Sequence, residues 1–288
     1  MKVKVCAKLN LTLNVLGKLD GFHSIDSVAT SVDVFDVVEV VPRADRRVTV
    51  SGLDRVSTLQ NTAYRAACAF IERFGSKQPL SGVDIVIEKG IPMGAGMGGS
   101  SADAAAVIYA LCALFNVDVG SPDVHALCAE LGSDVNYMLR GGLARLRGKG
   151  DDVECVKLGG TLYFALTTFS TSMSTAEVYS QYDKLNVIQA HADNGALMDE
   201  LRRGVLNGVL KRFNNHLQAA AASLSDYACD YLQLCKRQGL TPNMTGSGSA
   251  YYVAFASEQS AVNACNLLNA HGFATVLCRS VPHGITSY

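Results

Sequence analysis

The sequence predicts an α+β protein of two domains, and three observations support this fold class. The chain has 288 residues, which is enough for two domains of ordinary size. Strand-like alternation of apolar and polar residues fills much of its first 50 positions. Near the other end a strand, a helix and a strand follow one another, as in α+β domains. We therefore expect one domain over residues 1–155 and a second over residues 156–288.

The composition argues against several classes of partner. Hydrophobic residues make up 49% of the chain, as in a globular protein with a substantial core. The formal net charge of −1 argues against nucleic acid or an anionic membrane as a partner. No apolar run reaches membrane-spanning length, and no signal-peptide core is present near Met1. Nine scattered cysteines without a Cys-x-x-Cys pair are typical of reduced thiols, so we expect a cytoplasmic protein.

The early part of the chain predicts strands. Residues 9–16 alternate between apolar and polar side chains, so one face of this strand is buried. Its other face carries Lys8, Asn10, Thr12 and Asn14. By themselves these residues form either a solvated face or part of a site, and we favour the solvated face. Further strands are predicted over residues 26–34, 36–41 and 47–50.

A helix and a strand then lead to a glycine-rich loop. Residues 61–74 predict an amphipathic helix that Asn61 caps and Gly75 ends. The strand over residues 83–88 feeds the loop, and the loop opens an alanine-rich helix over residues 102–115.

The loop predicts an anion-binding site. Small residues let the backbone approach a bound group, and a helix N-terminus adds unpaired N–H groups and a partial positive charge. The expected anion is the phosphate chain of a nucleotide. Its predicted contacts are Pro92, Met93, Gly94, Ala95, Gly96, Met97, Gly98, Gly99, Ser100, Ser101 and Ala102. The P-loop pattern is absent, because no lysine lies between the glycines and Ser100.

The loop has two other interpretations. Gly94, Gly96 and Gly99 match the Gly-x-Gly-x-x-Gly pattern of dinucleotide-binding folds. That fold needs a second strand ending in an acidic residue about twenty positions further on. Asp118 lies near that distance, but the residues before it predict one uninterrupted helix. The second interpretation is an alanine-rich core helix behind a flexible turn. It is disfavoured because it does not explain why four glycines and two serines stand directly before the helix.

The second half of the chain alternates helices and strands. A helix is predicted from Ser121 to Leu131, and Asp134 follows it in a Leu-Gly-Ser-Asp-Val segment. In isolation such an aspartate is most often a helix cap. Other helices are expected from Ser174 or Thr175, as two long stretches between Asn194 and Gly239, and over residues 259–270. Strands are expected over residues 163–167, 251–255 and 273–278.

The string Pro-x-Gly-x-Gly-Met-Gly-Gly-Ser-Ser-Ala-Asp-Ala-Ala resembles the central phosphate loop of the GHMP kinases. This superfamily includes galactokinase, homoserine kinase and mevalonate kinase. The resemblance implies an N-terminal domain like domain 2 of ribosomal protein S5 and a ferredoxin-like C-terminal domain. Residues 7–11 and the segment Asp20-Gly21-Phe22-His23 are similar to the branch that phosphorylates a cytidylyl alcohol in non-mevalonate isoprenoid synthesis. ATP, Mg²⁺ and a small-molecule cytidylyl substrate are the implied ligands, for a monomer or weak homodimer.

The resemblance also implies roles for individual residues. Asp134 matches the catalytic aspartate of the family, with Lys8 beside it, although Asn136 stands where the family usually has proline. Ser100 or Ser101 would meet Mg²⁺. Adenine contacts are implied for Asn61 and Lys89. Substrate contacts are implied for Asn10, Phe22, His23, Thr175, Tyr179, Gly246, Ser247 and Gly248.

Alternatives remain open at several of these positions. Tyr179 is equally well an ordinary helix-face residue, and residues 243–250 have the composition of a flexible linker, although a strand follows at once. The function itself has two rivals: a homoserine or mevalonate type of GHMP kinase, and a non-catalytic nucleotide-binding protein. The second rival is disfavoured, because a pure binder needs neither Lys8 nor Asp134.

Overall fold

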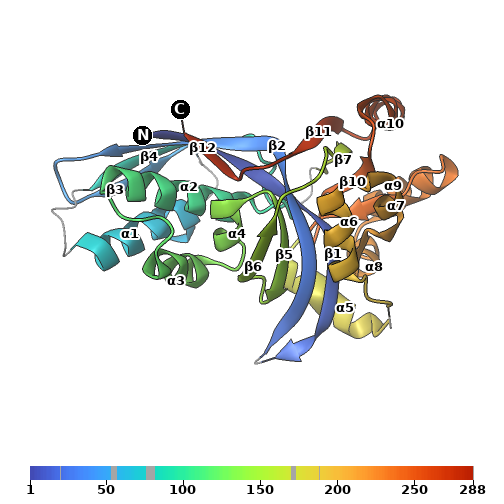
Figure 1. The fold of residues 1–288 in the computed structure, drawn as a ribbon, viewed down its shortest axis with the longest axis horizontal. Helices are drawn as coiled ribbons and strands as arrows, with labels where there is room; N and C mark the ends of the chain where they lie inside the picture. Colours follow the sequence, from blue (N-terminus) through green and yellow to red (C-terminus); the bar gives the residue numbers. More distant parts are fainter. Residues whose placement is uncertain (20, 53–56, 76–81, 170–172, 188, 288) are drawn as a thin grey trace.

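One mixed sheet of twelve strands runs through the part of the chain that the structure describes, which is residues 1–288 without 20, 53–56, 76–81, 170–172, 188 and 288 (Figure 1). The coordinates are a computed structural model, and they confirm the predicted α+β class. The strands are β1 (Lys2–Leu19), β2 (Phe22–Pro42), β3 (Val48–Ser51), β4 (Val83–Glu88), β5 (Leu143–Gly148), β6 (Asp152–Val156), β7 (Tyr163–Thr167), β8 (Asn214–Asn215), β9 (Pro242–Met244), β10 (Tyr251–Phe255), β11 (Thr275–Val281) and β12 (Ile285–Ser287).

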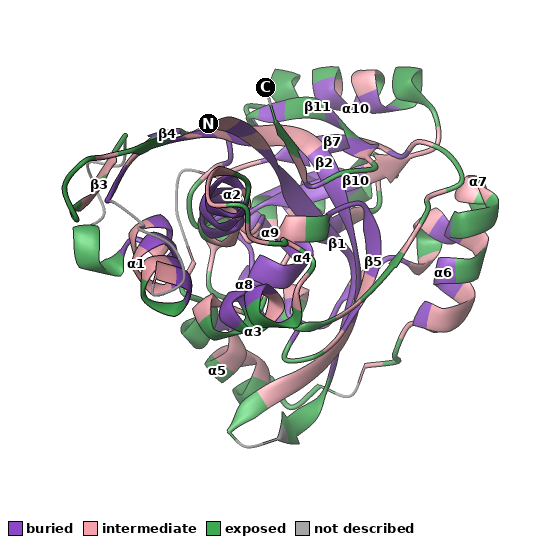
Figure 2. Cartoon of the chain, turned by 60° about the vertical axis from the view of Figure 1, so that its left-hand side comes forward, coloured by how far each residue is buried: buried purple, intermediate pink, exposed green. Residues whose placement is uncertain are grey.

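Helices pack on both halves of this sheet. They are α1 (Thr62–Phe74), α2 (Gly99–Leu114), α3 (Pro122–Leu131), α4 (Val135–Arg140), α5 (Thr175–Leu185), α6 (Asn194–Arg203), α7 (Leu206–Val209), α8 (Gln218–Ala222), α9 (Asp226–Arg237) and α10 (Glu258–Ala270). Figure 2 shows α2 largely buried, with α1 and α3 beside it. None of the helices in the described ranges is long and apolar enough to cross a membrane.

The long antiparallel hairpin of β1 and β2 forms the centre of the fold. Its register runs from Lys2 opposite Glu39 to Leu19 opposite Phe22. The prediction of separate strands over residues 26–34 and 36–41 is wrong, because β2 continues through both. The buried Asp36 carboxylate accepts hydrogen bonds from the N–H groups of Gly90 and Ile91 at 2.7 and 2.8 Å. Because these hydrogen bonds satisfy its carboxylate, Asp36 can be buried within one continuous strand.

The polar face of β1 is buried, contrary to the solvated face that the strand alone favours. Lys8, Asn10, Thr12 and Asn14 are each at most 5% exposed. Segments from the second half of the chain cover them and supply hydrogen-bond partners. The Asn14 side chain, for example, exchanges two hydrogen bonds with the backbone of Ala192. Buried polar groups need such partners, so this face of β1 packs against protein and is not exposed to water.

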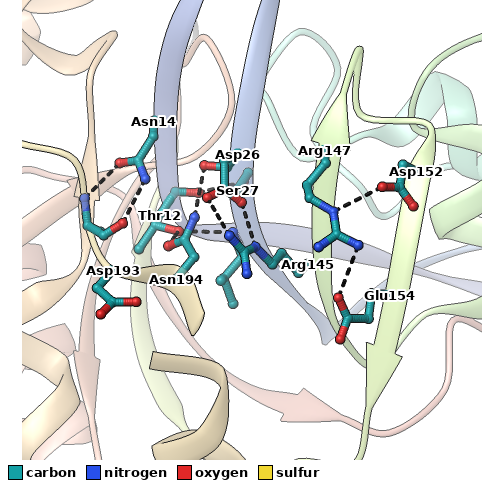
Figure 3. A network of polar contacts seen from close by, with 12 residues as sticks. Thr12, Asn14, Asp26, Ser27, Arg145, Arg147, Asp152, Glu154, Asp193 and Asn194 are labelled. Carbon is teal, nitrogen blue, oxygen red and sulfur yellow. Dashed lines mark hydrogen bonds and ion pairs between the residues drawn. The ribbon is translucent and has the colours of Figure 1, made fainter. Parts of the chain in front are cut away.

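A polar network joins α6 to three strands (Figure 3). The Thr12 hydroxyl donates to the Asn194 side chain at 2.7 Å, and Asn194 donates to the backbone carbonyl of Asp26 at 3.0 Å. Arg145 on β5 donates two hydrogen bonds to the Asp26 carboxylate, at 2.7 and 2.9 Å. Burial raises the pKa of Asp26, but the hydrogen bonds from Arg145 and Asn194 outweigh it, so the pKa lies below its ordinary value.

Helix starts follow the capping residues in the sequence. Asn61 accepts a hydrogen bond from the N–H of Ala63, Ser121 caps α3 in the same way, and Ser174 rather than Thr175 caps α5. Helix α2 begins at Gly99, three residues before the predicted start. Small residues at these positions let the glycine loop itself supply the first turn.

The prediction of two long helices between Asn194 and Gly239 is wrong. This region holds four α-helices of at most 12 residues and one 3-10 turn (Leu210–Arg212), and β8 interrupts them where Asn214 and Asn215 pair with β1. Helix α4 and the short strands β6, β8, β9 and β12 were also not predicted. These elements are too short to show a hydrophobic periodicity, and the segments that they pair with are distant in sequence.

Strands from the second half of the chain pair with both strands of the hairpin. The described residues form two hydrophobic clusters, one containing α1, α2 and much of the early strands, the other containing α8, α9 and α10. The predicted boundary, between residues 155 and 156, falls inside β6. Strand β12, from beyond that boundary, pairs with β1, and β11 pairs with β2. The division into residues 1–155 and 156–288 stays a prediction.

Replacement of Arg145 by methionine tests the network. Loss of the guanidinium leaves the part-buried Asp26 carboxylate without its main partner, which costs about 1–3 kcal/mol of unfolding free energy at pH 7. Because the pKa of Asp26 is lowered by folding, this contribution is present above about pH 4 and disappears as the pH falls further. Urea unfolding at several pH values measures it. The control Arg202→Met removes an exposed ion pair and should have a much smaller effect.

Candidate active site

A cleft of about 1090 Å³ opens where the glycine loop, the tip of the β1–β2 hairpin and the start of α5 meet. Nearly all the residues with a predicted site role line it. They are Lys8, Asn10, Phe22, His23, Asn61, Lys89, Pro92, Met93, Gly94, Gly96, Met97, Gly98, Gly99, Ser100, Ser101, Asp134, Thr175, Tyr179, Gly246, Ser247 and Gly248. Ala95 and Ala102 are the exceptions: their side chains are buried in the core and they are not part of the cleft wall. Asp20 lies outside the described residues.

The glycine loop crosses the strand β1 and ends at the N-terminus of α2. Gly98, the residue before the helix, has φ +77°, a conformation that glycine adopts without strain. A Cβ at this position would lie 2.0 Å from Cε of Met138 and 3.4 Å from Cγ of Lys8. The loop backbone therefore passes directly over the Lys8 side chain. The first residues of α2 line the cleft, so the unpaired N–H groups of a helix N-terminus are available there to an anion.

A second loop packs on the first, backbone against backbone. A Cβ at Gly96 would meet the carbonyl oxygen of Thr245 at 2.2 Å, and one at Gly246 would meet the carbonyl oxygen of Gly96 at 2.7 Å. The N–H of Ala250 also donates to the carbonyl of Ala95 at 3.2 Å. This packing excludes the flexible-linker interpretation of residues 243–250. The two small-residue loops form one continuous wall of the cleft.

Lys8 and Asp134 come together on this wall, 126 positions apart in sequence. The Lys8 ammonium lies 3.5 Å from Oδ2 of Asp134 and donates to Oδ1 of Asn10 at 2.5 Å. The Lys8 side chain is 6% exposed and that of Asp134 is 30% exposed, so solvent and ligands reach the carboxylate. Asp134 precedes α4 but makes no capping hydrogen bond. Its carboxylate is therefore paired with Lys8 and open to the cleft.

Asn10 holds the parts of this centre in place. Besides the Lys8 ammonium, its Oδ1 accepts a hydrogen bond from the N–H of Gly246 at 2.9 Å. Its amide nitrogen donates to Ser27 at 2.8 Å, and its own backbone N–H donates to the hydroxyl of Thr245 at 3.1 Å. One buried amide thus ties the lysine to the second loop.

Aromatic rings form the other end of the cleft. The ring of His23 stacks on Tyr179, with centroids 4.6 Å apart and planes inclined by 28°. Burial raises the pKa of Tyr179 to about 12, so its phenol is neutral at physiological pH. Phe22 is 58% exposed, and the ammonium of Lys149 lies 4.3 Å from its ring centroid. The hydroxyls of Thr175 and Ser247 are hydrogen-bonded at 2.9 Å, which links α5 to the second loop.

Lys89 belongs to a cluster of buried charges that the sequence did not reveal. Its ammonium contacts Asp36 at 2.5 Å and Asp103 at 2.9 Å. Burial raises the pKa of Asp103 to about 7, against the opposing effect of Lys89. The sequence did contain a signal for this cluster. Asp103 lies within a run of alanines and Asp36 between valine-rich stretches, and an acid buried in such surroundings needs a buried partner of opposite charge.

Lys18, Lys149 and Asp183 also line the cleft without having been predicted. Lys18 and Asp183 form an ion pair across 165 positions, which no local pattern indicates. Among the described residues, no three histidine, cysteine, aspartate or glutamate side chains gather as a metal site would require.

A glycine loop opening a helix beside a buried lysine and an accessible aspartate, on this mixed fold, defines a GHMP kinase. Residues 61–144 match the GHMP kinases N terminal domain. The chain is 38% identical over 256 residues to the 4-diphosphocytidyl-2-C-methyl-D-erythritol kinase of Cutibacterium acnes, covering 85% of this chain and 83% of the relative. It is 33% identical over 254 residues to that of Bacillus cytotoxicus, covering 87% and 86%. The chain belongs to the 4-diphosphocytidyl-2-C-methyl-D-erythritol kinase family.

Solved structures agree. A crystal structure of 4-(cytidine 5'-diphospho)-2C-methyl-D-erythritol kinase is similar to this chain with a TM-score of 0.80 and 28% identity, covering 98% of this chain and all of the other. A homoserine kinase from Cytophaga hutchinsonii gives a TM-score of 0.74 at 19% identity, covering 99% and 96%. At that identity the second likeness shows the fold alone.

Replacement of Gly96 by alanine tests the packing of the two loops. The added methyl group meets backbone oxygens and forces a side chain onto φ +72°, so we expect a loss of about 2 kcal/mol or more of stability. Separation of the loops should also raise the KM for ATP. Urea unfolding and steady-state kinetics measure both. Gly208→Ala is the control, because nothing lies within 4 Å of its Cβ; equal behaviour of the two variants would contradict the packing argument.

Proposed function

We propose that this protein transfers the γ-phosphoryl group of ATP to the 2-hydroxyl of 4-diphosphocytidyl-2-C-methyl-D-erythritol. The observation that carries the proposal is the Lys8–Asp134 pair, 3.5 Å apart on the wall of the cleft that also holds the glycine loop and the His23–Tyr179 stack. A phosphate-binding loop, a proton acceptor and an aromatic surface within one cleft are what a kinase for a base-bearing alcohol requires. Phosphoryl transfer depends chiefly on such positioning and on charge stabilisation.

The glycine loop is the proposed site of the triphosphate. The N–H groups of the loop and the first turn of α2 supply donors and a partial positive charge to the phosphate oxygens. At the other side of α2, Asn61 and Lys89 line the cleft where the adenosine would lie. Their polar groups are already fixed, Asn61 by capping α1 and Lys89 by two carboxylates, so they present a preorganised surface.

Ser100 and Ser101 fit the Mg²⁺ that such a kinase uses. Both line the cleft in the first turn of α2, and neither hydroxyl has a hydrogen-bond partner among the residues that the structure describes. Hydroxyl oxygen is a suitable ligand for a hard cation that keeps several waters and phosphate oxygens. When bound, Mg²⁺ would neutralise charge on the phosphates.

Asp134 is the proposed general base. Its partly exposed carboxylate would accept the proton of the substrate hydroxyl as that oxygen attacks phosphorus. Lys8, held by Asn10, would stabilise both the aspartate and the negative charge on the transferring group. Because Lys8 is almost completely buried, its charge is poorly screened by water and acts strongly across the short distance.

The aromatic end of the cleft is the proposed site of the cytosine base. The neutral ring of Tyr179 and the exposed ring of Phe22 offer faces for stacking, and His23 offers a ring nitrogen for the edge of the base. Thr175 and the loop of residues 246–248 line the same cleft and are the proposed contacts for the remainder of the substrate.

This aromatic surface disfavours homoserine or mevalonate as the acceptor, since neither has a ring to stack. Consumption of ATP should therefore depend on the cytidylyl substrate, and homoserine and mevalonate should give little turnover. A non-catalytic nucleotide binder would consume no ATP with any of the three. A cytoplasmic location and a monomer or weak homodimer stay predictions from the sequence.

The variant Asp134→Asn should fold normally and lose about 10²–10⁴-fold in kcat, because the proton acceptor is gone while the binding surfaces remain. Circular dichroism, ATP binding and steady-state turnover measure the three properties. Asp199→Asn, an exposed position on α6, is the matched control and should keep full activity. Near-normal turnover by Asp134→Asn would remove this residue from the mechanism.

Free cytidine diphosphate should inhibit competitively against the cytidylyl substrate and not against ATP. Loss of the stacking ring in Tyr179→Ala should weaken cytidine diphosphate binding by about tenfold or more, with ATP affinity unchanged. Isothermal titration with each ligand separates the two effects. Equal weakening of both ligands would point to a general disturbance of the cleft instead.

A further inference from the structure

Asp183, on α5, connects the two strands of the hairpin tip to the helix that carries Tyr179. Its Oδ2 accepts a hydrogen bond from the Lys18 ammonium at 2.6 Å, and its Oδ1 lies 2.8 Å from Nε2 of His23. Lys18 and His23 face each other in the register of β1 and β2. The tip of the hairpin lies beside α5 in Figure 1. The Asp183 carboxylate therefore links both β1 and β2 to α5.

The ring of His23 is held in a single orientation by these neighbours. Tyr179 stacks on one face at 4.6 Å, and Tyr182 approaches edge-on at 6.3 Å with planes inclined by 80°. Only 13% of the His23 side chain is exposed. Because the ring cannot turn without losing the stack and the hydrogen bond to Asp183, its two nitrogens have fixed and different surroundings.

The hydrogen bond to Asp183 decides which nitrogen carries the proton. The pKa of Asp183 is lowered, first by the hydrogen bond from Lys18 and further by that from His23, so its carboxylate is ionised and only accepts hydrogen bonds. Nε2 must then be the N–H donor. The Lys18 ammonium already balances the charge of this carboxylate, so its contact with His23 does not require a second cation.

Nδ1 of His23 is left as a hydrogen-bond acceptor. No residue in the described part of the chain forms a hydrogen bond with it, and His23 lines the main cleft. An acceptor there matches a pyrimidine that carries an amino group at C4, as cytosine does. Uracil has a carbonyl oxygen at the same position, and two acceptors repel each other.

We propose that Asp183 is a positioning residue that sets base selectivity, by holding His23 in the tautomer whose Nδ1 accepts a hydrogen bond from the amino group of cytosine. The inference rests on the proposed function, which places the base against His23 and Tyr179. It adds a reason for preferring cytosine to uracil, which stacking by itself does not distinguish, since every base has a face to stack.

The variant Asp183→Asn tests the proposal. An asparagine can turn its amide N–H₂ toward Nε2, which transfers the ring proton to Nδ1 and converts the acceptor into a donor. The wild-type chain should bind cytidine diphosphate about tenfold more tightly than uridine diphosphate. In Asp183→Asn this ratio should fall toward one, while ATP affinity stays unchanged. Isothermal titration of the full chain with the three nucleotides measures it.

Two further variants complete the test. Asp183→Glu keeps a carboxylate and should restore the selectivity, even where the absolute affinity is lower. Asp230→Asn, an exposed aspartate on α9, is the matched control and should behave as wild type. An Asp183→Asn variant that loses affinity equally for both diphosphates would show a merely structural residue and would overturn the proposal.

A measurement on the wild-type chain keeps the proposal testable if Asp183→Asn does not fold. Nitrogen-15 NMR of the histidine rings, with His23→Gln to assign the signal, should show a neutral ring protonated on Nε2. A ring protonated on Nδ1 would overturn the proposal while leaving the proposed function intact. Absence of any cytidine diphosphate binding by the wild-type chain would instead overturn the proposed function, and this inference with it.

Discussion

The antiparallel pairing of β1 with β2 is the constraint on which the rest of the structure depends. Nearly every part of the site is placed relative to this hairpin: Lys8 lies in its middle and His23 at its tip. Its register shifts between Cys6 and Ala7 and again after Asn10. These irregularities flank Lys8, and such bulges change the direction in which nearby side chains point. Strands from both halves of the chain pair with the hairpin, which makes it a rigid support for the cleft.

Charge burial follows from the same architecture. A strand covered on both faces places Lys8 in an apolar setting, where an unpaired ammonium costs several kcal/mol. Asp134 and Asn10 offset that cost and at the same time orient the lysine toward the cleft. Lys89, between Asp36 and Asp103, repeats the arrangement below the glycine loop. Of these buried groups, all but Asp36 also line the cleft.

Much of the fold and of the site could be predicted from local pattern. Caps such as Asn61 and Ser121 act within three residues, and the glycine loop acts through its own backbone, so both are visible in the sequence. The long helices predicted between Asn194 and Gly239 failed for the opposite reason. Pairing of Asn214 and Asn215 with β1 breaks that region, and the partner strand lies about two hundred positions away. The buried partners of Lys89 were missed because ion pairs of this kind are not local.

The sequence by itself determined the glycine loop that opens α2, the α+β class and the residue types available to a site, because these depend on residue type and short spacing. Only the tertiary structure decided which of them meet. It buried the polar face of β1, brought Asp134 to Lys8 and set Asp183 against His23. Contacts between positions more than a hundred residues apart arise from strand pairing and helix packing, and no local pattern records them.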